Sequence, residues 1–115
     1  MATDFQTKEV KDLGTSFTNL TGSYSTGEVT VHAIYVSNKN ADYRTFYLSL
    51  FDNAGTPAEK ASILYNVDIA PKSSLVVEKP INLTTSTTNT DQRQLRVKAS
   101  HTESLDVVAS VLVIT

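Results

Sequence analysis

The stretch SLDVVASVLVIT, residues 104–115, decides the fold class of this chain. One side of this stretch, taken as an extended chain, carries Leu105, Val107, Ala109, Val111 and Val113. A period of two is typical of a β-strand, and an apolar run of about 11 residues is shorter than the roughly 20 that a membrane-spanning helix needs. We therefore expect a strand in the middle of a sheet, where each buried side chain stabilises the fold by about 1.5–3 kcal/mol.

The same period of two recurs along the rest of the chain. It predicts strands at 28–37, 43–51, 63–69, 74–78 and 93–100, with a further strand at 13–20. Segments rich in Gly, Asn, Pro, Ser and Thr separate these runs and are typical of turns. Seven to eight short strands with this spacing predict an all-β protein: an antiparallel β-sandwich, either immunoglobulin-like or jelly-roll-like.

The side-chain patterns also predict which faces are buried. Both faces of 28–37 are largely apolar, so both are expected to be buried, with His32 as a structural histidine inside the protein. In 93–100, Leu95, Val97 and Ala99 are expected to point inward while Gln94, Arg96 and Lys98 face water. The sequence TPAE at 56–59 resembles a helix capping box, which would support at most one or two helical turns.

Length and charge restrict the classes of function. The 115 residues suit a single domain, expected as a partner-contacting N-terminal segment at 1–14 and a β-sandwich at 15–115. A net charge of −2 offers no basic excess for nucleic acid or for an anionic membrane, so neither partner is expected. The N-terminal residues are too polar for a signal peptide, which predicts that the protein is made in a cytoplasm and is either kept there or released by lysis. Cysteine is absent, so disulfides and thiolate chemistry are excluded.

Candidate catalytic and metal-binding residues are sparse. His101 lies near Glu103, Ser104 and Asp106, but members of a catalytic triad usually converge from separate loops, so a solvated turn is the preferred interpretation. The oxygen-rich loops NKNAD (38–42) and FDNAG (51–55) could hold calcium, although neither has the spacing of a known calcium loop. We therefore expect no enzyme activity, no metal and no cofactor.

Surface residues suited to binding a partner are more numerous. Exposed tyrosines can stack on sugars or anchor protein interfaces, and a row of basic residues can dock an acidic surface. The expected partner-contact residues are Phe5, Lys8 and Lys11 in the N-terminal segment, Tyr43 and Tyr47 on one strand, and Arg93, Arg96 and Lys98 on another.

Three stretches resemble small virion proteins of tailed bacteriophages: KEVKDLGTSF, VDIAPKSSLVVEKPINL and LRVKASHTESLDVVASVLVIT. The matching motifs lie at Lys11–Ser16, Ile69–Leu75 and Val97–Val108. The resemblance implies a structural protein of the virion, for example a capsid decoration or cement protein or a neck- or tail-associated component. It also implies contacts with major capsid or neck and tail proteins, a homo-oligomer and no catalytic residues. The alternative is a carbohydrate-binding module or adhesin tip that uses Tyr43, Tyr47 and the loop at 38–42.

Overall fold

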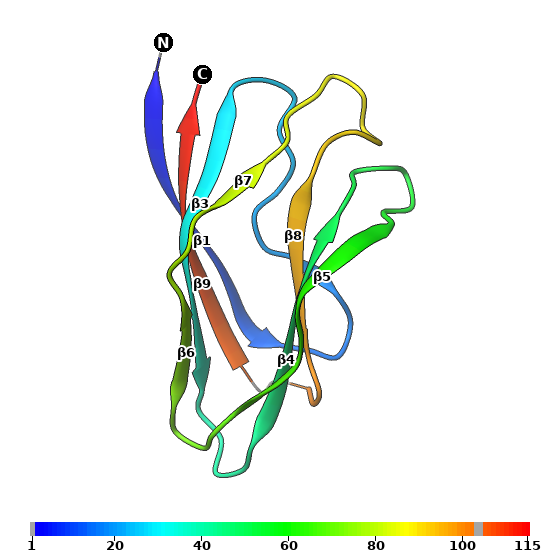
Figure 1. Ribbon diagram of the computed structural model, residues 1–115. Coiled ribbons are helices and arrows are strands. Elements are labelled where there is room, and N and C mark those ends of the chain that lie inside the picture. The colour runs from blue at the N-terminus through cyan, green and yellow to red at the C-terminus, as the bar shows by residue number, and fades with distance from the viewer. Residues whose placement is uncertain (1, 103–104) are drawn as a thin grey trace.

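The computed structural model describes residues 2–102 and 105–115 as two antiparallel sheets packed face to face (Figure 1). The described strands are β1 (Thr3–Leu13), β2 (Thr18–Asn19), β3 (Glu28–Asn38), β4 (Arg44–Phe51), β5 (Glu59–Ile69), β6 (Ser74–Val77), β7 (Ile81–Leu83), β8 (Gln94–Ala99) and β9 (Leu105–Ile114). The predicted all-β sandwich is confirmed. The described chain has nine strands rather than seven to eight, because β1 and the three-residue β7 were not expected; of the strand expected at 13–20, only the two residues of β2 form.

The first sheet has the order β1-β9-β3-β6, with β7 also pairing with β3, and the second has the order β2-β8-β4-β5. The closing strand β9 pairs along its length with β1 on one side and β3 on the other. Its five inward side chains are at most 5 % exposed: Leu105, Val107, Ala109, Val111 and Val113. The central position predicted for this strand is therefore confirmed.

The N-terminal residues belong to the first sheet. Residues 1–14 were expected to precede the sandwich, but Thr3–Leu13 forms β1, the outer strand beside β9 (Figure 1). Ala2 and Thr115 extend this pairing by exchanging two backbone hydrogen bonds of 3.0 and 2.9 Å. The sandwich thus begins near Thr3 rather than at residue 15. The sequence did not reveal this strand because an edge strand buries few side chains, here Leu13 fully and Val10 in part.

A β-bulge in β3 changes which residues it buries. The register with β9 shifts between Val31 and Ala33, so His32 is an extra residue and lies exposed. Beyond the bulge, Ile34 and Val36 point inward, on the same face as Val29 and Val31. The expectation of a strand buried on both faces, with His32 inside, was therefore wrong. Tyr35, 47 % exposed, now points to the outer face.

The second sheet confirms one set of inward residues and corrects another. Leu95, Val97 and Ala99 of β8 are buried as expected, but Gln94 is buried too, because its Nε2 donates a 2.7 Å hydrogen bond to the Asp52 carbonyl. The helical turn considered at 56–59 does not form. The Asp52 carboxylate instead accepts hydrogen bonds from the Ala54 and Ala58 N–H groups at 3.2 and 2.9 Å and closes the loop before β5.

Candidate functional site

Tyr47, Arg96 and Lys98, three of the predicted contact residues, lie together on the outer side of the second sheet. Tyr47 is the direct cross-strand partner of Lys98, and Ser49 is the partner of Arg96. Successive residues of a strand point to opposite faces, so these side chains lie opposite the buried Leu48 and Val97. The sequence thus predicted correctly that this row faces away from the core.

The remaining predicted contact residues lie elsewhere. Tyr43 directly precedes β4 and is 63 % exposed, while Arg93 directly precedes β8 and donates hydrogen bonds to the carbonyls of Thr90 and Gln92. Phe5, Lys8 and Lys11 lie on β1, at the edge of the other sheet. The structure therefore places three predicted residues on one face of the second sheet and three on an edge of the first, with Tyr43 and Arg93 apart from both.

The grouped residues form what we call the aromatic–cation face, which consists of Phe17, Tyr47, Phe51, Tyr65, Arg96 and Lys98. At its centre, the Lys98 Nζ lies 4.8 Å from the centroid of the Phe17 ring and 4.7 Å from that of Tyr47. Each such contact is worth about 0.5–1 kcal/mol at an exposed site. The two rings therefore hold the ammonium group in place on the surface.

Two ring pairs extend the face on either side of Lys98. Tyr47 and Tyr65 meet edge to face with centroids 5.4 Å apart, and Phe17 and Phe51 do so at 4.9 Å. The Arg96 Cζ lies 5.6 Å from the centroid of the Phe51 ring. Within residues 2–102 and 105–115, neither Arg96 nor Lys98 forms an ion pair with a carboxylate. The face therefore presents cations that an acidic group of a partner can neutralise.

An irregularity in β5 brings Tyr65 to this face. The register between β4 and β5 shifts between Phe46 and Leu48, and Asn66 has a φ of 58°. The Asn66 Oδ1 accepts a 3.2 Å hydrogen bond from the Tyr47 hydroxyl, and Tyr65 is 74 % exposed. Strict alternation predicts instead that Tyr65 shares a face with Ile69, which is buried.

No pattern in the sequence indicated Phe17 and Phe51 as members of the face. Phe17 precedes the two-residue strand β2, and Phe51 ends β4, so their contact depends on strand pairing distant in sequence.

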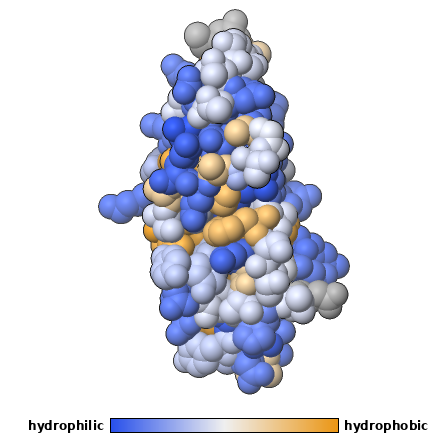
Figure 2. Space-filling model, turned by 90° about the vertical axis from the view of Figure 1, so that its right-hand side faces the viewer, coloured by the Kyte–Doolittle hydropathy of each residue, from blue (hydrophilic) through white to orange (hydrophobic). Residues whose placement is uncertain are grey.

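Figure 2 views the side of the molecule that lies to the right in Figure 1, where the second sheet lies. It shows an apolar band across the middle, between hydrophilic areas above and below.

An ion cluster lies at the opposite sheet. The Lys39 Nζ contacts Asp12 Oδ1 at 2.9 Å and Asp106 Oδ2 at 3.0 Å, which links the ends of β1, β3 and β9. Hydrogen bonds to Asp12 and Asp106 raise the pKa of Lys39. Burial alone would raise the pKa of Asp106, but the Asp12 backbone N–H and the Lys39 ammonium outweigh it, so that pKa is lowered. The two ion pairs thus connect the ends of three strands at the surface of the first sheet.

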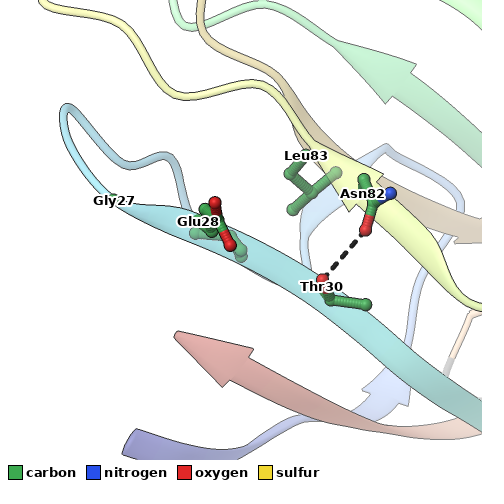
Figure 3. Close-up of a pocket in the computed structure, with 6 residues that line it drawn as sticks. Gly27, Glu28, Thr30, Asn82 and Leu83 are labelled. Atoms are coloured by element: carbon green, nitrogen blue, oxygen red, sulfur yellow. Dashed lines mark hydrogen bonds between the residues drawn. The ribbon is translucent and has the colours of Figure 1, made fainter. Parts of the chain in front are cut away.

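A depression of about 390 Å³ lies between the start of β3 and β7 (Figure 3). Its lining residues are Gly27, Glu28, Val29, Thr30, Asn82 and Leu83. The Thr30 hydroxyl donates a 2.9 Å hydrogen bond to the Asn82 amide oxygen across the two strands (Figure 3). Glu28 is the single ionisable residue of this lining, so it offers hydrogen bonding without the acid–base pair that general catalysis uses.

The other chemical candidates have structural roles or lie outside the described residues. Ser104, which the triad hypothesis requires, is outside them, as is Glu103. The His101 Nδ1 lies 2.9 Å from the Ser100 hydroxyl. The described part of the chain contains no group of three or more His, Cys, Asp or Glu residues that could hold a metal ion. It also contains no helix long and apolar enough to cross a membrane.

The loops considered for calcium use their oxygens internally. The Asn38 Oδ1 accepts a 2.9 Å hydrogen bond from the Asn40 N–H, while its Nδ2 donates to the carbonyls of Asp42 and Ile69, each at 3.0 Å. Asp52 contacts Lys60 at 3.5 Å in addition to the loop N–H groups. The side-chain oxygens of Asn38 and Asp52 therefore organise turns.

No protein-family model matches the sequence, and no curated protein sequence matches it. Solved structures do resemble the fold. The CBM22-1 xylan-binding domain of Paenibacillus barcinonensis Xyn10C has a TM-score of 0.53 at 6 % identity, covering 93 % of this chain and 71 % of that chain. A chain of the acid-stable capsid of Helicobacter pylori bacteriophage KHP30 has a TM-score of 0.54 at 11 % identity, covering 100 % and 89 %.

A third similar structure is a chain of the T13 particle of the virus IBDV, with a TM-score of 0.50 at 12 % identity over 96 % of this chain and 30 % of that chain. At these identities the likeness shows the fold. The structural neighbours therefore include viral capsid proteins and a carbohydrate-binding module, all of which share a β-sandwich with this chain.

Proposed function

We propose that the protein is a non-enzymatic structural component of a bacteriophage virion that acts through protein–protein contacts. Its place would be that of a capsid decoration or cement protein, or of a neck or tail accessory. The observation that carries this proposal is the likeness in fold and size to the phage capsid chain, which spans 100 % of this chain and 89 % of that one. The resemblance of the sequence motifs to virion proteins of tailed phages supports the same class.

The aromatic–cation face supplies a surface for the proposed contacts. Aromatic and arginine side chains are enriched at the energetic centres of protein interfaces, and this face combines three at least partly exposed aromatic rings with Arg96 and Lys98; the fourth ring, Phe51, is 8 % exposed and packs against Phe17. Because Lys98 is already held between two rings, binding would cost little side-chain entropy. The proposed partner surface is acidic, as expected for a neighbour of two cations that form no ion pair with a carboxylate of the described residues.

The test is incorporation into particles. Virions assembled in cells that express the wild-type chain are purified on a density gradient, and the chain is quantified by mass spectrometry relative to the major capsid protein. We expect a constant copy ratio for the wild type, and a reduced ratio for Lys98→Glu combined with Tyr65→Ala. Lys72→Glu, an exposed charge reversal in the turn after β5, serves as the control. A wild-type chain that stays at the top of the gradient contradicts the proposal.

A carbohydrate-binding module is the second candidate, favoured by the likeness to the xylan-binding domain and by the two most exposed tyrosines. Tyr65 and Tyr43 are 74 % and 63 % exposed, whereas the Tyr47 ring already contacts Lys98 and Tyr65. Affinity gel electrophoresis with xylan and a glycan array test this candidate. The candidate is supported if the wild type is retarded by xylan and Tyr65→Ala or Tyr43→Ala abolishes this retardation. Phe5→Ala is the control and should preserve it, because Phe5 lies on the other sheet. Absence of wild-type binding to any glycan contradicts it.

A further inference from the structure

The free edge of β1 is a long and regular row of backbone hydrogen-bonding groups. In the described chain, β1 has a paired neighbour only on the β9 side, and its register with β9 is uninterrupted from Thr3 to Val10. An edge of this kind is a template for another strand.

The other sheet edges of the described chain are less suited to strand addition. The β5 strand, at the edge of the second sheet, has three register shifts relative to β4, and bulges of this kind twist an edge away from a partner. The remaining edge strands β2, β6 and β7 have two, four and three residues. The β1 strand contains no proline, the residue that would block an added strand.

The hydrogen-bond pattern shows which residues of β1 face the free edge. Ala2 and Thr115 exchange both backbone hydrogen bonds, which makes them a hydrogen-bonded pair of the antiparallel ladder. Such pairs alternate with non-hydrogen-bonded pairs, so the even-numbered residues of β1 bond to β9. The odd-numbered residues Thr3, Phe5, Thr7 and Glu9 therefore direct their N–H and C=O groups outward.

We propose that two copies of this chain associate through antiparallel pairing of β1 with β1 about a two-fold axis at Gln6. The outward backbone groups restrict the register, because odd residues must form the hydrogen-bonded pairs. A centre at Gln6 pairs Phe5 with Thr7 and Thr3 with Glu9. The same centre places Asp4 of one copy opposite Lys8 of the other. The two-fold axis generates a second, equivalent pair between the remaining Lys8 and Asp4.

Charge complementarity selects this register among those that the backbone permits. Lys8 lies on the side of β1 that faces the second sheet, alternating with Gln6 and Val10, and it forms no ion pair within the described residues. A charge so placed on an edge strand opposes pairing unless the partner neutralises it. A centre at Lys8 would bring the two lysines together, and a centre at Thr7 would place Lys8 opposite Gln6. Of these three centres, only the one at Gln6 places Asp4 opposite Lys8.

The first experiment is the mass of the purified full chain by light scattering over micromolar to submillimolar concentrations. We expect twice the 12.5 kDa of one chain, and a return toward the single-chain mass in Thr7→Pro. The Thr7 N–H faces the free edge, so this change leaves the bonds to β9 in place and the thermal midpoint close to wild type. Gln6→Pro is the matched control, because it removes a bond to β9 and lowers the thermal midpoint.

The register is tested by single cysteines, since the chain has none of its own. Opposed residues of a non-hydrogen-bonded pair are about 4.5 Å apart between Cα atoms, within the range that a disulfide spans. Gln6→Cys should therefore give a disulfide-linked dimer under mild oxidation, and Lys8→Cys should not. Lys8→Asp should abolish the dimer, and the exchange Asp4→Lys with Lys8→Asp should restore it.

A wild-type chain that keeps the single-chain mass throughout overturns the proposal, as does a dimer that Thr7→Pro leaves intact. Linkage through Lys8→Cys without linkage through Gln6→Cys overturns the register at Gln6. These measurements use no particles, so their failure is separate from a failure of the proposed virion function. That function is tested by incorporation and requires no dimer in solution.

Discussion

Gly27 enters β3 in a conformation that other residues rarely adopt, and its backbone lies against the end of β9. Its φ is +87°, and a Cβ built at this position overlaps the Ile114 carbonyl oxygen and lies 3.3 Å from the Ile114 carbonyl carbon. The Gly27 carbonyl also accepts a 2.8 Å hydrogen bond from the Thr85 hydroxyl. Gly27→Ala should therefore force β3 away from the last residues of β9.

The expected cost has two parts. A positive φ costs an alanine about 1–2 kcal/mol relative to glycine. Relieving the overlap moves backbone rather than a flexible side chain and weakens the pairing of Glu28 with Ile114, which adds a similar amount. The sum, roughly 2–4 kcal/mol, corresponds to a fall of about 8–16 °C in the thermal midpoint of a domain of this size.

Two other glycines provide matched controls for calorimetry and urea unfolding. Gly22 has a φ of +77° with no atom within 4 Å of a built Cβ, so Gly22→Ala should show the conformational cost alone, about 1–2 kcal/mol. Gly55 has neither a positive φ nor a close neighbour, and Gly55→Ala should leave stability unchanged or raise it by up to about 1 kcal/mol. Equal effects at Gly27 and Gly22 would refute the role assigned to the Ile114 contact.

Three further changes test the rest of the fold. Hydrogen bonds from the Ala58 and Ala54 N–H groups lower the pKa of Asp52, so its contribution to stability is present above the unfolded pKa near 4 and is lost as pH falls through the folded pKa. In a plot of the urea midpoint against pH, Asp52→Asn should therefore reduce the fall of the midpoint at acid pH. The same fall in the variant as in the wild type would contradict this. Phe46 is 0 % exposed at the centre of the second sheet, so Phe46→Ala should lower the free energy of unfolding in urea by about 3–5 kcal/mol. A decrease below about 1 kcal/mol would show that Phe46 is not a core residue. His32→Ala should change the free energy of unfolding by less than about 0.5 kcal/mol, because the bulge places His32 on the surface. A large loss of stability would indicate instead that His32 is buried.

Six of the eight predicted contact residues lie on two separate surfaces, the aromatic–cation face and the β1 edge, while Tyr43 and Arg93 belong to neither. Tyr47, Arg96 and Lys98 lie on the second sheet, and Phe5, Lys8 and Lys11 lie on the edge strand of the first. Under the two proposals above, the edge would bind a second copy of the chain while the face contacts another protein. Variants of one surface should therefore leave binding at the other unchanged.

The fold class and the central position of β9 could be predicted from the sequence, because both depend on local alternation. Five apolar side chains on one face of a strand are stable only inside a sandwich, and these five are buried. The outward direction of Arg96 and Lys98 followed from the same period in β8. The absence of cysteine likewise excluded thiol chemistry without any structure.

Only the tertiary structure decided where that alternation breaks and which distant residues meet. The bulge at His32 and the shift at Asn66 are set by pairing with other strands, and each changes the face of the residues beyond it. Gln94 is buried because a carbonyl 42 positions away accepts its amide hydrogen. Phe17 and Phe51 join Lys98 through the order β2-β8-β4, and residues 3–13 become an edge strand because β9 offers them a free side. A local sequence pattern specifies the period of a strand, but the contacts between strands that build a surface depend on register, which arises only when the whole sandwich assembles.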